Sequence, residues 1–130
     1  MNDILVPISP GELLDKITIL QIKAERIDDD AKVANVKTEL KLLTDVWNSS
    51  VDADATIDAL TEELKTINEA LWEIEDDIRD EERGKRFGDR FIELARSVYV
   101  TNDERANAKK KVNLHLNSTI VEEKSYQDYK

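Results

Sequence analysis

The chain has 130 residues, a formal net charge of −10 at pH 7 and no cysteine. The lack of cysteine excludes disulfides, thiolate zinc sites and cysteine nucleophiles, and the negative charge argues against nucleic-acid binding, which depends on neutralising phosphates. Hydrophobic residues make up 40% and charged residues 37% of the chain, with three glycines and two prolines, which is typical of a helical protein. The length predicts a single domain over residues 1–130.

The first ten residues, "MNDILVPISP", lack the basic part and the long apolar part of a signal peptide. No apolar run approaches the roughly 18 residues needed to cross a bilayer. The lack of cysteine also fits a reducing compartment. We therefore expect a cytoplasmic protein that does not insert into membranes.

The first predicted helix begins at "SPGE", where Ser9 can cap the helix and Pro10 suits its first position. Glu12 stands where a capping box requires an acidic side chain. Apolar residues then recur at helical spacing until a run of three aspartates, and a second apolar stripe of the same period leads to Trp47. These two stripes predict an antiparallel hairpin of two helices, 10–27 and 30–47.

The third predicted helix, 56–83, has the most regular apolar pattern. Apolar residues recur every three or four positions from Ile57 to Ile78, as expected for one face of a helix. The stripe fits the core of a helical bundle, and it also fits a bundle whose stripe continues into a dimer seam. We expect a homo-oligomer, in the simplest case a homodimer.

The fourth predicted helix, 89–116, begins after "RFG". The sequence "TNDE" from Thr101 is a second capping-box pattern, so it permits a kink there. Residues 117–130 form a short tail that is expected to pack on the bundle through Ile120, Val121, Tyr126 and Tyr129. The predicted fold is all-α, an up-down bundle of four main helices with a docked C-terminal tail.

The charge changes sign between the third and the fourth predicted helices. Residues 52–82 carry 13 acidic and two basic side chains, whereas residues 83–113 carry nine basic and four acidic ones. In an up-down bundle these segments are antiparallel neighbours. Ion pairs between them therefore explain the pattern without a ligand.

Carboxylates three positions apart form a candidate magnesium site. Magnesium prefers carboxylate oxygens, and all-α nucleotide pyrophosphohydrolases hold it with such pairs on adjacent helices. Here only the E-x-x-D pattern is present, and a long acidic helix also produces that spacing by chance. A solvated acidic face is therefore the favoured interpretation. The candidate metal ligands are Glu12, Asp15, Glu73 and Asp76.

The segment "VYVTNDERANAKKKVN", residues 98–113, continues the fourth helix with few apolar residues. A helix face that combines Arg, Tyr, Asn and Lys can donate several hydrogen bonds to a phosphate or carboxylate, and arginine adds bidentate geometry. A buried polar layer that satisfies itself, with Arg79 or Arg96 paired to Asp103, is the alternative. Periodicity alone does not decide between a binding face and a structural network.

Four segments, "PGELLDKITILQIKAERI", "LWEIEDDIR", "FIELARSVYVTNDERANAKKKVN" and "VEEKSY", follow one another along nearly the whole chain. Together they resemble an uncharacterised family of small helical bacterial and phage proteins, a domain of unknown function with GELLDK, RSVY-x-TND and EEKSY motifs. Asn117 stands where the family pattern leads us to expect glycine, and asparagine tolerates the same left-handed conformation. The resemblance implies a helical fold and no particular reaction.

The motifs of this family coincide with the polar residues that periodicity does not assign to a core, which favours a binding site, closed by the segment 122–126. We expect a non-enzymatic binding or accessory module without a cofactor. It would recognise a small anionic ligand or a protein partner through the polar face of the fourth helix. The predicted ligand-binding residues are Arg96, Tyr99, Asn102, Asp103, Arg105, Lys109 and Lys16.

Two other functions stay open. A divalent-metal-dependent hydrolase of phosphate esters or nucleotides would hold Mg²⁺ at the four candidate carboxylates and stabilise phosphate charge with Arg96, Arg105 or Lys109. A structural assembly protein would instead present a large apolar interface and no pocket.

Overall fold

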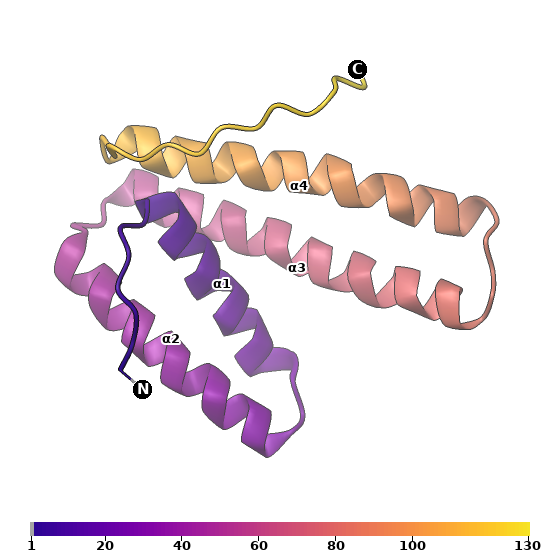
Figure 1. Ribbon diagram of the computed structural model, residues 1–130, viewed down its shortest axis with the longest axis horizontal. Coiled ribbons are helices and arrows are strands. Elements are labelled where there is room, and N and C mark those ends of the chain that lie inside the picture. The colour runs from indigo at the N-terminus through magenta and orange to yellow at the C-terminus, as the bar shows by residue number, and fades with distance from the viewer. Residues whose placement is uncertain (1) are drawn as a thin grey trace.

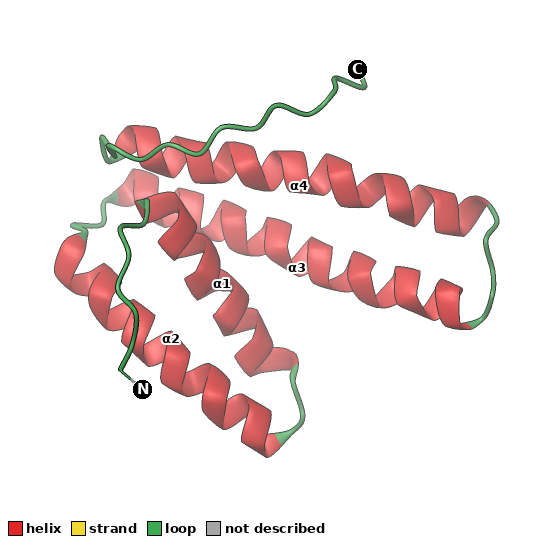
Figure 2. Ribbon diagram, viewed as in Figure 1, coloured by secondary structure: helices red, strands yellow, loops and turns green. Residues whose placement is uncertain are grey.

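The computed structural model describes residues 2–130 and contains four α-helices (Figure 1). No strand occurs within this range (Figure 2), and none of its helices is both long and apolar enough to cross a membrane. The predicted all-α fold with four helices is confirmed, and the helix ends differ from the predicted ones by at most three residues. The helices are α1 (Pro10–Arg26), α2 (Asp30–Ser50), α3 (Ala55–Arg83) and α4 (Asp89–His115).

Side-chain caps start the first three helices. The Ser9 hydroxyl accepts the backbone N–H of Glu12 at 3.2 Å, and aspartates cap α2 and α3 in the same way. α2 continues to Ser50 because the backbone N–H of Val51 donates to the carbonyl of Trp47, which extends the helix beyond its predicted end. These local bonds explain where the elements begin and end.

α4 passes through Thr101 without interruption (Figure 1). The kink that the "TNDE" pattern permits does not form, because this segment lies between two turns that both pack inward, at Leu94 and Ala108. In a continuing helix the backbone donors bond to carbonyls of the preceding turn, so a side-chain cap is not needed. The helix ends at His115, and Asn117, two residues later, has a left-handed φ of 55° as expected for this position.

The helices form two antiparallel hairpins that meet at one end (Figure 1). α1 packs against the other three helices, whereas the Cα atoms of α2 closely approach only those of α1. The other end of the α3–α4 hairpin projects beyond α1 and α2 (Figure 1). The core lies where the hairpins meet, and includes Leu13, Leu14, Ile17, Trp47, Ile57, Leu60, Leu64, Ala108 and Val112.

The C-terminal tail, residues 117–130, turns back and runs along α4 (Figure 1). It is docked mainly by polar contacts rather than by the expected apolar ones, because Tyr126 is 82% exposed and Ile120 is also exposed. Lys110 pairs with Glu123 at 3.2 Å. The hydroxyl of Tyr129 donates to Asp103 at 2.6 Å, and its ring meets that of Tyr99 edge to face.

Candidate ligand-binding site

The site begins where the first turn of α1 meets the last turns of α4. The backbone N–H of Gly11 donates to the side-chain oxygen of Asn113 at 2.7 Å. A Cβ atom at Gly11 would lie only 2.4 Å from the carbonyl oxygen of Lys109, so no larger residue fits without moving a helix. This close approach brings Glu12 of the first turn and Asp15 of the second turn to the side of α4.

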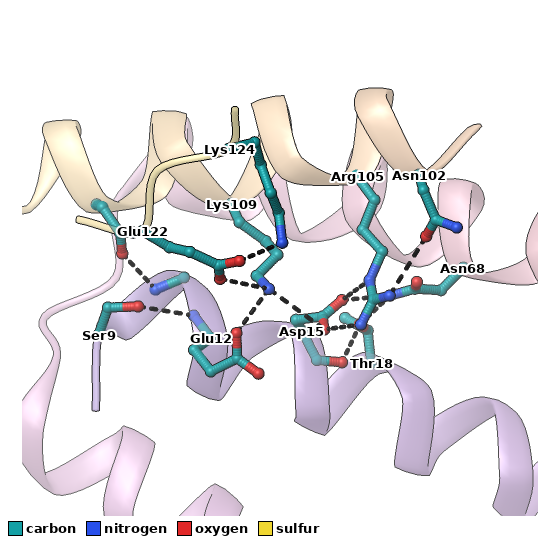
Figure 3. A network of polar contacts seen from close by, with 12 residues as sticks. Ser9, Glu12, Asp15, Thr18, Asn68, Asn102, Arg105, Lys109, Glu122 and Lys124 are labelled. Atoms are coloured by element: carbon teal, nitrogen blue, oxygen red, sulfur yellow. Dashed lines mark hydrogen bonds and ion pairs between the residues drawn. The ribbon is translucent and has the colours of Figure 1, made fainter. Parts of the chain in front are cut away.

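Asp15 is the centre of a buried polar network (Figure 3). Its side chain is 1% exposed. Nε of Arg105 donates to one carboxylate oxygen at 2.9 Å, and Nη2 of the same guanidinium donates to the other. Nδ2 of Asn68 donates to Asp15 and to the Thr18 hydroxyl, each at 3.0 Å. The network joins α1, α3 and α4, and the hydrogen bond with Asp15 raises the pKa of Arg105.

The three consecutive lysines of α4 point to three different partners. Lys109 lies 2.6 Å from Glu12 and 3.5 Å from Glu122 of the tail, and its side chain is only 13% exposed. The next lysine pairs with the tail and the third with Glu63 of α3. Successive residues of a helix point about 100° apart, so only one of the three reaches the junction with α1.

A cleft of about 420 Å³ lies between α4 and the tail, within the usual size range of small-molecule sites. Three of its lining residues are cationic and one, Asp103, is anionic. The carboxylate of Glu122 contacts both Lys124 and Lys109 (Figure 3). The hydrogen bond with Lys124, followed by the charge of Lys109, lowers the pKa of Glu122. The lining residues are Val98, Tyr99, Asn102, Asp103, Arg105, Ala106, Lys109, Lys124 and Tyr126.

Five of the seven predicted ligand-binding residues line this cleft, and two do not. Arg96 is exposed and lines a separate hollow with Ile92 and Val100. It precedes Arg105 by nine residues, about two and a half helical turns, so the two side chains leave opposite sides of α4. Lys16 is exposed on α1, outside the cleft.

The structure does not bring the four predicted metal ligands together. Within residues 2–130 there is no group of three or more His, Cys, Asp or Glu side chains able to hold a metal ion. Glu12 and Asp15 are engaged by the cations of α4, whereas Glu73 pairs with Arg26 at 2.9 Å. The predicted ligands stay apart because Glu12 and Asp15 lie in the first two turns of α1, whereas Glu73 lies beside Arg26 at the other end of that helix.

Sequence reasoning did not identify Asn68 and Thr18, which support Asp15. Asn68 follows Leu64 by four positions and Ile67 by one, within the apolar stripe of α3. A polar residue beside a buried apolar stripe must have a hydrogen-bond partner, and this was the signal that could have identified Asn68. Lys124 and Tyr126 of the segment 122–126 line the cleft, and closure of a binding site by this segment stays a prediction.

A family model described as "Family of unknown function (DUF6165)" matches residues 4–129. The chain belongs to this family. Neither the curated proteins nor the solved structures provide a match. The DUF6165 match includes the four helices and nearly all of the tail, so every residue that lines the cleft lies inside it.

Proposed function

We propose that the protein is a non-enzymatic binding module that recognises a small anionic ligand in the cleft between α4 and the tail. The supporting observation is that three cationic side chains line this cleft, namely Arg105, Lys109 and Lys124. The carboxylate of Glu122 already contacts two of them. A carboxylate of the tail therefore already occupies part of the site, next to Asp15 and Glu12 of α1, and a ligand would bring a further anionic group.

The cations are held in place before a ligand arrives. Asp15 engages Arg105 through two nitrogens, and Glu12 engages Lys109. Side chains that are already fixed lose little conformational freedom on binding, so more of the interaction energy contributes to affinity. A charge-assisted hydrogen bond to a phosphate or carboxylate is also stronger than one between neutral groups.

Glu122 is expected to compete with the ligand. An incoming anion takes the position of this carboxylate between Lys109 and Lys124, because the same donors cannot bond fully to both. Substitution Glu122→Gln removes the competing charge and keeps the shape of the side chain. We expect this variant to bind inorganic phosphate more tightly than the unchanged protein does.

The test is a thermal-unfolding scan of the pure protein with inorganic phosphate and with acetate. A ligand at a hundred times its dissociation constant adds about 2.7 kcal/mol to the stability of the folded state, which raises the midpoint by several degrees. Lys109→Met should abolish the shift. Lys111→Met is the matched control, because this neighbouring lysine pairs with Glu63 of α3 instead. Equal shifts in both variants, or no shift with either anion, would contradict the proposal.

The same scan distinguishes the alternative functions. A shift with Mg²⁺ that EDTA reverses would favour the metal-dependent hydrolase, and turnover of phosphate esters would then be measured. A protein without any ligand response would favour partner binding or assembly. The cytoplasmic location and the homodimer stay predictions, and sedimentation of the purified chain tests the second.

A further inference from the structure

A second cavity of about 400 Å³ lies at the fork between the two hairpins, beside the network of Figure 3. Side chains of α1, α3 and α4 line it, and the proposed anion site does not include it. Its apolar part includes Ile19, Leu71 and Trp72. Asn102 and Arg105 line both this cavity and the cleft, so these two residues mark the boundary between them.

Asn68 presents a fixed acceptor to this cavity. The residue is 5% exposed, and its Nδ2 atom is held by Asp15 and Thr18. Its Oδ1 atom accepts no hydrogen bond from residues 2–130. Within that range, every side-chain oxygen or nitrogen that is fully buried has a hydrogen-bond partner, so an unpartnered Oδ1 cannot be fully buried. Oδ1 is therefore accessible from the cavity that Asn68 lines, with its direction set by the two bonds of the amide nitrogen.

Arg105 presents a donor at the same place. Nε and one terminal nitrogen bond to Asp15, whereas the other terminal nitrogen, Nη1, lies 3.5 Å from Oδ1 of Asn102, at the limit of a hydrogen bond. A buried acceptor, an underused donor and an indole side chain thus line one cavity. A planar heteroaromatic ring matches this set, because its edge carries donors and acceptors while its face stacks on tryptophan.

The two cavities differ in charge. Lysines line the cleft, whereas the fork cavity has the carboxylates of Glu75 and Asp76 on its wall, with Arg79 paired to the first of these. An anionic group is repelled from these carboxylates and attracted to the lysines of the cleft. A ligand with an uncharged ring and an anionic group would therefore bind in one orientation, with Arg105 between its two parts.

We infer that the anionic ligand carries a planar heteroaromatic ring that stacks on Trp72, and that its anionic group reaches the cleft past Arg105. A nucleoside monophosphate is the simplest probe of this class. The inference rests on the proposed function, because the anion site of the cleft would bind the anionic group of the same ligand. It adds a ring site at the fork, formed by Trp72 and Asn68.

The experiment uses Trp72 as its own reporter. The chain has two tryptophans, and Trp47 lies in the core, so Trp47→Phe leaves a single indole at the fork. This variant is titrated with inorganic phosphate, adenosine and AMP, and the emission of Trp72 is followed. Stacking of one base on an aromatic side chain strengthens binding about 10- to 100-fold. We therefore expect AMP to bind at least 10-fold more tightly than phosphate and to quench Trp72, whereas phosphate leaves the emission unchanged.

A second set of variants keeps the test valid if the Trp47 variant does not fold. With Trp47 retained, Trp72→Leu should reduce the affinity for AMP at least 10-fold and leave the affinity for phosphate unchanged, as followed by thermal unfolding. Trp72→Phe should restore most of the difference, because phenylalanine keeps an aromatic face. Phe87→Leu is the matched control for removing an aromatic ring, since Phe87 is 52% exposed in the α3–α4 connection, away from both cavities.

The outcomes separate the two claims. Equal affinity for phosphate and AMP, unaffected by Trp72→Leu, would overturn the ring site and leave the proposed function standing. Quenching by AMP that Lys109→Met does not weaken would overturn the inference that one ligand spans both cavities. Binding of neither phosphate nor AMP would overturn the proposed function, and the inference with it.

Discussion

The two ends of the α3–α4 hairpin use charge in different ways. At the junction with α1, Asp15 is 1% exposed and its partner Arg105 is 30% exposed. At the projecting end, Asp77 and Arg90 are 50% and 55% exposed and lie 3.4 Å apart. Both are acid–arginine pairs that involve α4. The first joins three helices through shared hydrogen bonds, whereas the second joins only α3 and α4.

Burial determines what each pair contributes. An exposed pair contributes about 0 to 1 kcal/mol because water screens it. A desolvated carboxylate depends on its partners, since removing one of them leaves a charge or a donor unsatisfied. The sequence shows the same residue types at both ends, so charge composition alone does not indicate where a network will form.

The largest expected effect comes from Asp15→Ala. This variant leaves Arg105 without its partner and removes one of the two acceptors of Asn68. We expect a loss of about 3 kcal/mol in the free energy of unfolding, at the low end for broken buried pairs because Arg105 keeps some contact with water. Urea unfolding at neutral pH measures this loss.

Asp77→Ala is the matched variant at the projecting end. It removes an aspartate from an exposed pair, so the free energy of unfolding should fall by no more than about 1 kcal/mol. Similar losses in the two variants would contradict the distinction between the two ends.

A smaller effect is expected from Gly11→Ala. The new Cβ would lie 2.4 Å from the backbone oxygen of Lys109 and 2.8 Å from Oδ1 of Asn113, so α1 must shift away from α4. Overpacking costs about 1 to 3 kcal/mol, and a clash with a backbone atom belongs at the upper end, above the roughly 1 kcal/mol that alanine gains over glycine in a helix. The expected result is a lower thermal midpoint together with weaker phosphate binding.

Gly88→Ala tests the same substitution at the projecting end. A Cβ at Gly88 meets no atom within 4 Å. Its effect should stay within about 1 kcal/mol, since a small loss at the helix cap opposes a small gain from the stiffer unfolded chain. If this variant destabilised the protein as much as Gly11→Ala, close approach would not explain the glycine at the junction.

The smallest effect concerns the tail. The hydrogen bond from Tyr129 to Asp103 raises the pKa of Tyr129 from 10.0 to about 12. Because the pKa is raised, this contact stabilises the docked tail fully below pH 10.0, and this stabilisation is lost as the pH rises through about 12. The tail should therefore loosen in this interval while the core network, which does not include Tyr129, stays intact.

Phenolate absorbance during alkaline titration tests this order. The unchanged protein should show a late phase that Tyr129→Phe removes. Asp103→Asn should move that phase to lower pH because it removes the hydrogen bond from the phenol to a carboxylate and, with it, the nearby negative charge. An Asp103→Asn titration that overlays that of the unchanged protein would mean that this contact does not hold the tail.

Much of the fold could be predicted because its signals are local. Apolar spacing identified the four helices, and the "SPGE" cap identified the first residue of α1. The "TNDE" pattern in α4 suggested a kink that does not form, because packing on both sides keeps the helix continuous. Local capping patterns are therefore informative at real helix ends and misleading inside a packed helix.

The candidate site could be predicted only in part. Arg105 and Lys109 were identifiable because a helix with few apolar residues needs another explanation for its polar face. Arg96 was assigned to the same face although it lies on the other side of α4. The carboxylates at positions 12, 15, 73 and 76 share a spacing rather than a location, since spacing along a helix says nothing about the distance between two helices.

The sequence by itself determined the helices, the charge asymmetry and the family, because each depends on residue types and their order. Tertiary structure decided which of the three lysines of α4 reaches α1, which carboxylate is desolvated and which faces enclose the two cavities. These outcomes depend on the angle and rotation at which helices pack. The contact between Gly11 and α4 constrains both quantities. It joins residues that are far apart in the sequence, since Gly11 and Asn113, which share a hydrogen bond, are separated by 102 positions.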